Sequence, residues 1–229
     1  MRKITIITII AAMAITAIAA DAYKFPGWDK EASLYEAEIA RYEAASETQK
    51  PFTVTHYNQI KLARALAGVE IASFDDIHSA AQKSFPGNAK YACNYACARA
   101  FAIYNANKNS QKAISILREA YEFSLRAKSH HCGVIAQNTT MRKKLGISND
   151  EAVTVLINAL SVIESARYRD IKTMLNALYE LLPDCSVAEA EQLAALKKLN
   201  RRFSKELLGG NKEQWEPIIA RLRTVIAAY

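Results

Sequence analysis

Residues 111–127 read QKAISILREAYEFSLRA, and residues 150–166 read DEAVTVLINALSVIESA. The two segments align with each other, with small and large side chains at the same four offsets. Small side chains let a neighbouring helix approach closely, and large ones fill the gap between helices. The aligned pairs are Ala113 with Ala152, Leu117 with Leu156, Ala120 with Ala159, and Tyr121 with Leu160. A helical pattern that recurs at a regular spacing predicts stacked helical hairpins.

The composition favours helices along the whole chain. The 229 residues include only seven glycines and five prolines, whereas a β-sandwich needs frequent turns. No alternating strand pattern of useful length occurs. We therefore expect an all-α fold of antiparallel helical hairpins, which form either a short α-solenoid or an irregular helical bundle.

Capping and turn signals set the expected helix boundaries. Ser148 with Glu151, and Ser186 with Glu189, have the spacing of a capping box, in which each side chain bonds the other residue's backbone N–H. Residues 130–145 are ambiguous, because they are polar for a helix. The expected helices are 29–46, 53–67, 73–84, 88–106, 111–127, 148–166, 168–182, 186–208 and a last helix that either contains Pro217 or begins beside it.

The N-terminal residues have the pattern of a secretory signal peptide. Arg2 and Lys3 precede an uncharged apolar run, Ile4–Ala20. Small residues follow at the spacing that an export peptidase recognises. The protein is therefore expected to be exported (periplasmic or secreted), with a signal over 1–22 and a single all-helical domain over 23–229. The candidate cleavage sites follow Ala19, Ala20 and Ala22.

An uncleaved N-terminal anchor is the alternative, because the apolar run Ile4–Ala20 reaches the lower limit of length for a membrane span. Cleavage of the signal would lower the net charge from +7 to about +5. A positive charge this mild is typical of an ordinary soluble surface. We expect no nucleic-acid partner and no cofactor.

The two aligned segments resemble the second helix of the tetratricopeptide repeat. The preceding helix matches that family's first helix in part, at Ala100, Phe101 and Tyr104. The spacing is longer than the usual repeat of that family, and the proline that commonly ends a unit is missing. The resemblance covers residues 94–165 and implies a concave groove that binds a peptide or a partner protein. The implied groove residues are Asn94, Tyr95, Ala98 and Asn105.

Two disulfides are predicted from the four cysteines, which are Cys93, Cys97, Cys132 and Cys185. Cys93 and Cys97 share one face of a helix, where two cysteines one turn apart cannot easily bond each other. One of them is expected to pair with Cys132 and the other with Cys185, because exported proteins meet an oxidising compartment. One disulfide with two buried free thiols is a variant of this prediction.

A metal-binding or small-molecule-binding module is the alternative interpretation of the same residues. Thiolate and imidazole groups are the ligands that tetrahedral zinc prefers. The candidate ligands are Cys93, Cys97, His131 and Cys132, with His130 as a further candidate.

No catalytic motif is found. The sequence lacks the haem, metalloprotease, nucleophile-elbow and phosphate-loop signatures. The leading expectation is a non-enzymatic protein that acts by binding a protein or peptide. An exported helical enzyme, whose acid and base have no sequence signature, is the alternative.

One helix carries a cluster of basic residues. They lie opposite the apolar stripe of that helix, so a solvated face is the simple interpretation. Weak contact with an anionic surface is the functional one. The residues are Lys197, Lys198, Arg201, Arg202 and Lys205.

Overall fold

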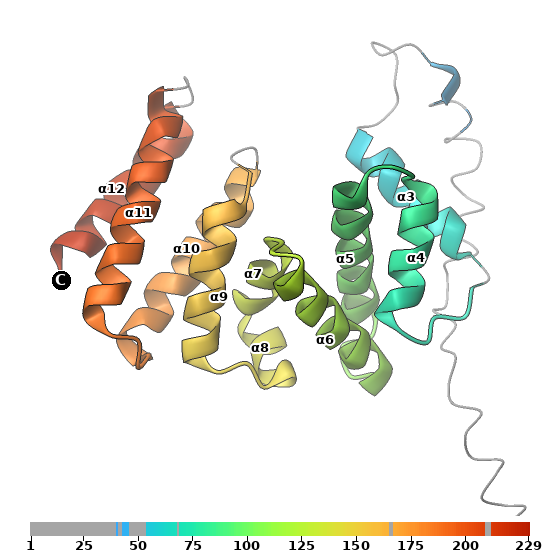
Figure 1. The fold of residues 1–229 in the computed structure, drawn as a ribbon, viewed down its shortest axis with the longest axis horizontal. Helices are drawn as coiled ribbons and strands as arrows, with labels where there is room; N and C mark the ends of the chain where they lie inside the picture. Colours follow the sequence, from blue (N-terminus) through green and yellow to red (C-terminus); the bar gives the residue numbers. More distant parts are fainter. Residues whose placement is uncertain (1–39, 41–42, 46–53, 68, 165–166, 209–211) are drawn as a thin grey trace, which may run out of the picture. The chain divides into compact units, whose positions relative to one another are not determined.

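A computed structural model describes residues 40, 43–45, 54–67, 69–164, 167–208 and 212–229 of the chain. The predicted signal peptide, and nearly all of the helix expected over 29–46, lie outside the described residues. The regular elements of the described part are helices (Figure 1), which confirms the predicted all-α class. Their bounds are α3 (Val54–Leu66), α4 (Phe74–Ser84), α5 (Ala89–Ala106), α6 (Gln111–Arg126), α7 (His131–Ala136), α8 (Thr139–Leu145), α9 (Asn149–Val162), α10 (Tyr168–Leu181), the 3-10 helix η3 (Leu182–Asp184), α11 (Glu189–Leu208) and α12 (Lys212–Ala227).

The chain divides into two compact units, Met1–Asn88 and Ala89–Tyr229. In the first unit α3 packs on α4. Phe74 and Ile77 of α4 are fully buried, as the apolar face of an amphipathic helix should be. The single domain predicted over 23–229 stays a prediction, as does the tetratricopeptide-like resemblance.

In the second unit, consecutive helices pack as neighbours: α5 on α6, α9 on α10 and α11 on α12. The core is apolar and includes Leu117, Leu156 and Leu160 from the two aligned segments, all fully buried. Apolar burial of this kind is the main source of stability for such a unit. Every candidate site described below lies in this second unit.

Helices α7 and α9 approach each other very closely. A Cβ added at Gly133 of α7 would lie inside van der Waals contact with the Cβ of Ala159 and 3.0 Å from the sulfur of Met174. The two backbones therefore come as near as two small residues allow. The close approach that the sequence predicts at Ala159 is present.

Residues 130–145, which the sequence leaves ambiguous, form two short helices. α7 ends before Asn138, whose side chain accepts a hydrogen bond from the N–H of Met141 at 3.0 Å and so begins α8. Gly146 ends α8 in the left-handed conformation, with φ of 68°. The break re-aims the chain, which lets the short helix α7 pack against both α6 and α9.

The capping-box prediction is half correct for α9. Ser148 accepts a hydrogen bond from the N–H of Glu151 at 3.1 Å, as expected for an N-cap. The carboxylate of Glu151, however, accepts from the hydroxyl of Tyr121 at 2.7 Å and so connects α9 to α6. A tertiary contact has taken the place of the local one. The end of the helix also differs, because α9 stops at Val162 rather than Ala166.

The capping-box prediction is wrong for α11. This helix begins at Glu189, and Ser186 lies in the preceding turn. The N–H of Ser186 donates to the carboxylate of Asp150 at 2.7 Å, and its hydroxyl donates to the same carboxylate. Ser186, which the sequence predicts to cap α11, is therefore bound by Asp150 at the N-terminus of α9 instead. Pro217 lies inside α12, which is the first of its two predicted placements.

Candidate functional site

Three of the four cysteines come together where α5, α6 and α7 meet. Cys93 and Cys97 lie on α5, and Cys132 lies in the first turn of α7. All three side chains are buried, with exposed fractions of 9% for Cys93, 1% for Cys97 and 4% for Cys132. The inward orientation that the sequence predicts for the α5 pair is confirmed. We call these three residues, with Ser129 and His131, the thiol cluster.

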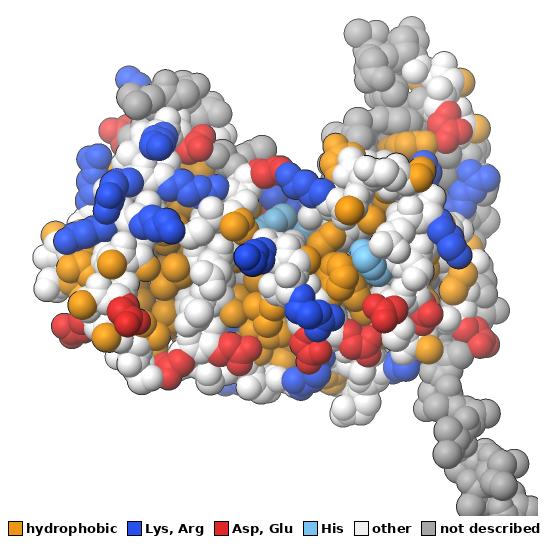
Figure 2. All heavy atoms as spheres, in the orientation of Figure 1, with side chains coloured by type: hydrophobic (Ala, Val, Ile, Leu, Met, Phe, Trp, Pro, Cys, Tyr) orange, Lys and Arg blue, Asp and Glu red, His pale blue; other side chains and the backbone are white. Residues whose placement is uncertain are grey.

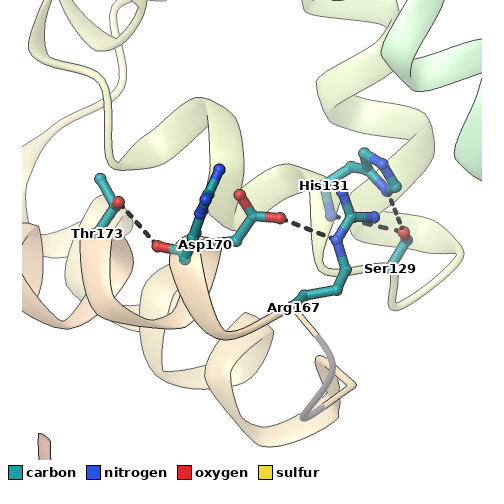
Figure 3. A network of polar contacts seen from close by, with 6 residues as sticks. Ser129, His131, Arg167, Asp170 and Thr173 are labelled. Carbon is teal, nitrogen blue, oxygen red and sulfur yellow. Dashed lines mark hydrogen bonds and ion pairs between the residues drawn. The ribbon is translucent and has the colours of Figure 1, made fainter. Parts of the chain in front are cut away.

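Ser129 connects the members of the thiol cluster. Its hydroxyl oxygen lies 3.0 Å from Nδ1 of His131 and hydrogen-bonds Cys93. Its carbonyl oxygen accepts a hydrogen bond from the thiol of Cys132 at 3.0 Å. One residue between α6 and α7 therefore contacts an imidazole and two thiols from different helices. Figure 3 shows Ser129 and His131 side by side, with Arg167 close to them.

The thiols of the cluster differ in acidity. Hydrogen bonds from Cys97 and Ser129 outweigh burial and lower the pKa of Cys93 to about 7. The shared hydrogen bond and burial raise the pKa of Cys97 well above its usual value, and burial raises the pKa of Cys132 to about 11. Near neutral pH the cluster therefore holds one partly ionised thiol beside two protonated ones.

Two buried histidines lie at the edge of the cluster. The ring centroids of His130 and His131 are 4.2 Å apart. Burial lowers the pKa of His130 to about 4 and that of His131 well below its usual value, and the nearby charge of Arg167 acts in the same direction. Arg167 itself donates to Asp170 at 2.8 Å (Figure 3). Both imidazoles are therefore neutral at pH 7. Nε2 of His130 is buried and has no hydrogen-bond partner.

A cavity of about 400 Å³ lies beside the cluster and is bounded by α6, α7 and α9. Ser129 and Cys132 form part of its wall. Two apolar side chains at its edge face solvent, Leu125 with 37% and Val162 with 52% of its surface exposed. We call this space the α6–α9 cavity. Its lining residues are Leu125, Lys128, Ser129, Cys132, Asn158, Ala159, Ser161 and Val162.

Cys185 lies in different surroundings. It follows η3 and lines a second cavity, of about 530 Å³, with residues of α10, α11 and α12. There the side-chain amide of Gln192 donates to the sulfur of Cys185 at 3.3 Å and to the carbonyl of Val187 at 2.7 Å. Tyr229 donates in turn to Gln192. All four cysteines are free thiols in this structure, and the two predicted disulfides stay predictions.

The arrangement of the cluster does not favour the zinc alternative. Within the described part of the chain, no group of three or more His, Cys, Asp or Glu side chains is arranged to hold a metal ion. The hydroxyl of Ser129 lies 3.0 Å from Nδ1 of His131 and hydrogen-bonds Cys93.

The predicted groove residues all lie on α5. Asn94, Tyr95 and Ala98 are half-buried and Asn105 is exposed. The ring of Tyr95 meets that of Tyr91 edge to face, with centroids 6.1 Å apart. None of these residues lines the two cavities described above. The predicted groove and the α6–α9 cavity are thus separate surfaces.

Lys and Arg side chains gather over α11 and α12 in Figure 2, in agreement with the predicted basic face. Lys197, Lys198, Arg201 and Lys205 are exposed. Arg202 is the exception, since it is half-buried and its guanidinium donates to the carbonyl oxygens of Leu160 and Ile163 at the end of α9. It acts as a C-terminal cap for α9 rather than as a surface charge.

Sequence reasoning missed Ser129 and the two exposed apolar residues of the α6–α9 cavity. No local pattern marks them, because they meet only when α6, α7 and α9 pack.

Comparisons with protein-family models, with curated proteins and with solved structures give no match for this chain. Among the described helices, none combines the length and the apolar character needed to span a bilayer.

Proposed function

We propose that the protein is an exported, non-enzymatic helical protein that binds a segment of another polypeptide in the α6–α9 cavity. The observation that carries this proposal is the cavity itself: a recess of about 400 Å³ with exposed apolar side chains at its edge. Spaces of this size accept one or two large side chains. Exposed apolar residues around a recess are typical of interaction sites.

The chemistry of the lining indicates which segment would fit. Leu125 and Val162 offer apolar contact for an aliphatic anchor side chain. Asn158 lies in the wall and offers an amide that can donate to and accept from a peptide backbone. The one charged residue of the lining is the exposed Lys128. We therefore expect a partner segment in which an aliphatic residue stands next to Asp or Glu.

To test this proposal, peptides that bind the mature protein are selected from a displayed library of short random peptides. We expect the selected peptides to share an aliphatic residue beside an acidic one. Val162→Asp should weaken their binding about tenfold or more, because it removes apolar contact and repels the acidic residue. Val69→Asp is the matched control, since Val69 is a similarly exposed valine (38%) of the first unit. Peptides without a common pattern, or equal binding to the Val162→Asp variant, would contradict the proposal.

Export is proposed from the N-terminal pattern alone. The basic start, the apolar run Ile4–Ala20 and the small residues at its end support a cleaved signal. Mass spectrometry of the protein from an exporting cell tests it. A chain that begins at Ala20, Asp21 or Tyr23 is expected, whereas an intact N-terminus in the membrane fraction would favour the anchored alternative.

A further inference from the structure

We propose that the thiol cluster is a thiol–disulfide exchange site, in which Cys93 attacks an external disulfide and Cys132 completes a disulfide between α5 and α7. The substrate class is a low-molecular-weight or polypeptide disulfide. This role differs from the two permanent cross-links that the sequence predicts, because it is reversible and leaves Cys185 outside. It does not rest on peptide binding in the α6–α9 cavity.

The geometry distinguishes the attacking thiol from the others. Cys93 is the most exposed thiol of the cluster, at 9% against 1% for Cys97 and 4% for Cys132. It also accepts hydrogen bonds from Cys97 and from the hydroxyl of Ser129, which stabilise the thiolate. The least buried thiol of the cluster, with two donors that favour its thiolate, is the best candidate for the nucleophile that exchange requires.

The geometry also selects the second thiol. Cys97 follows Cys93 by one helical turn, a placement from which a disulfide cannot easily form within a regular helix. Cys132 lies on a different helix and is hydrogen-bonded to the carbonyl of Ser129, whose hydroxyl contacts Cys93. Because Cys132 lies on a different helix, a disulfide between Cys93 and Cys132 needs a shift of α7 relative to α5 but no distortion within α5.

The exchange proceeds in two balanced steps. The Cys93 thiolate attacks one sulfur of the external disulfide, so a mixed disulfide forms and the second external sulfur leaves as a thiolate. Cys132 then gives its proton to that thiolate and attacks the Cys93 sulfur, and the first external sulfur leaves. In total two protein thiols are oxidised, and one external disulfide is reduced to two thiols.

Oxidised glutathione is the probe for this proposal. The full mature protein is reduced, freed of reductant, incubated with the probe at neutral pH, alkylated and digested with trypsin. Cleavage after Lys90, Arg99, Lys128 and Arg142 gives peptide 91–99, which holds Cys93 and Cys97, and peptide 129–142, which holds Cys132. We expect these two peptides linked through Cys93, with Cys97 and Cys185 alkylated.

Two variants make the test specific. Cys185→Ser should give the same cross-link, because Cys185 lies in the other cavity. Cys132→Ser should stop at a glutathione adduct on Cys93, which shows the order of the two steps even if the variant is less stable. Four alkylated thiols in the wild-type protein, or a disulfide between any other pair, would overturn the proposal.

Discussion

The close approach of α7 and α9 gives a sharp test of the packing. Gly133→Ala places a methyl group inside van der Waals contact with the Cβ of Ala159 and 3.0 Å from the sulfur of Met174. Overpacking of this kind costs about 1–3 kcal/mol. Replacing a helical glycine by alanine stabilises the helix by about 0.5–1 kcal/mol, which offsets part of this cost. The net expected loss of unfolding free energy is therefore between about 0 and 2.5 kcal/mol, with a central value near 1 kcal/mol.

The partner substitution, Ala159→Gly, should also destabilise the protein alone. It introduces a glycine into α9, which costs about 1 kcal/mol, and removes a fully buried methyl group worth about 0.8 kcal/mol. In the double variant the methyl group has moved from one helix to the other, so the clash with residue 159 is gone. Met174 is a flexible side chain and can adjust. We expect the double variant to lie within about 1 kcal/mol of the wild type.

Urea unfolding followed by the fluorescence of Trp215 measures these differences. Trp215 is buried in the core cluster that includes Ala159 and stacks on Phe203, with ring centroids 5.4 Å apart. Trp28→Phe leaves Trp215 as the only tryptophan in every variant. The losses of unfolding free energy in the two single variants should add up to about 2 kcal/mol more than the loss in the double variant. Additivity within about 0.5 kcal/mol would refute the reasoning.

Three further predictions concern caps and buried imidazoles. Arg202→Met should cost about 1–3 kcal/mol of unfolding free energy, because two carbonyls at the end of α9 lose a charged donor. The control Arg201→Met, at an exposed position, should change the unfolding free energy by less than about 0.5 kcal/mol. Ser148→Ala should cost about 1 kcal/mol through loss of the α9 N-cap, again by urea unfolding. The pKa of His130 is lowered to about 4 in the folded protein. Between pH 6.5 and 4 the unfolded chain therefore binds more protons than the folded one, and stability falls as the pH drops through this range. His130→Asn should flatten that fall of the urea midpoint, and an unchanged slope would show that other groups cause it.

Local signals predicted the helices well wherever a local contact decides the boundary. α5 and α6 have almost the bounds expected, because a turn before Ala89 and the cap at Ser110 act within a few residues. The predictions failed where a distant residue took the capping group. Asp150 binds Ser186, and Tyr121 takes the carboxylate of Glu151. Neither contact can be predicted from the spacing of residues along one helix.

In the candidate site, too, the sequence predicted what depends on one helix and missed what depends on contacts between helices. Helical periodicity was enough to place Cys93 and Cys97 on one inward face. It could not show that Ser129 contacts both Cys93 and His131, because those contacts depend on how α7 leaves α6. The pairing of Cys185 with an α5 cysteine stays a prediction, and the structure places Cys185 in a different cavity from the one that Cys132 lines.

The packing of α7 connects stability to thiol chemistry, because Gly133 directly follows Cys132 in the chain. If Gly133→Ala moves α7 away from α9, the position of Cys132 relative to Cys93 changes as well. The yield of the Cys93–Cys132 disulfide with oxidised glutathione should then fall in Gly133→Ala. It should recover in the double variant with Ala159→Gly, in parallel with the recovery of unfolding free energy. A yield that falls in the single variant but does not recover in the double would show that the added methyl group itself, rather than the displacement of α7, blocks the exchange.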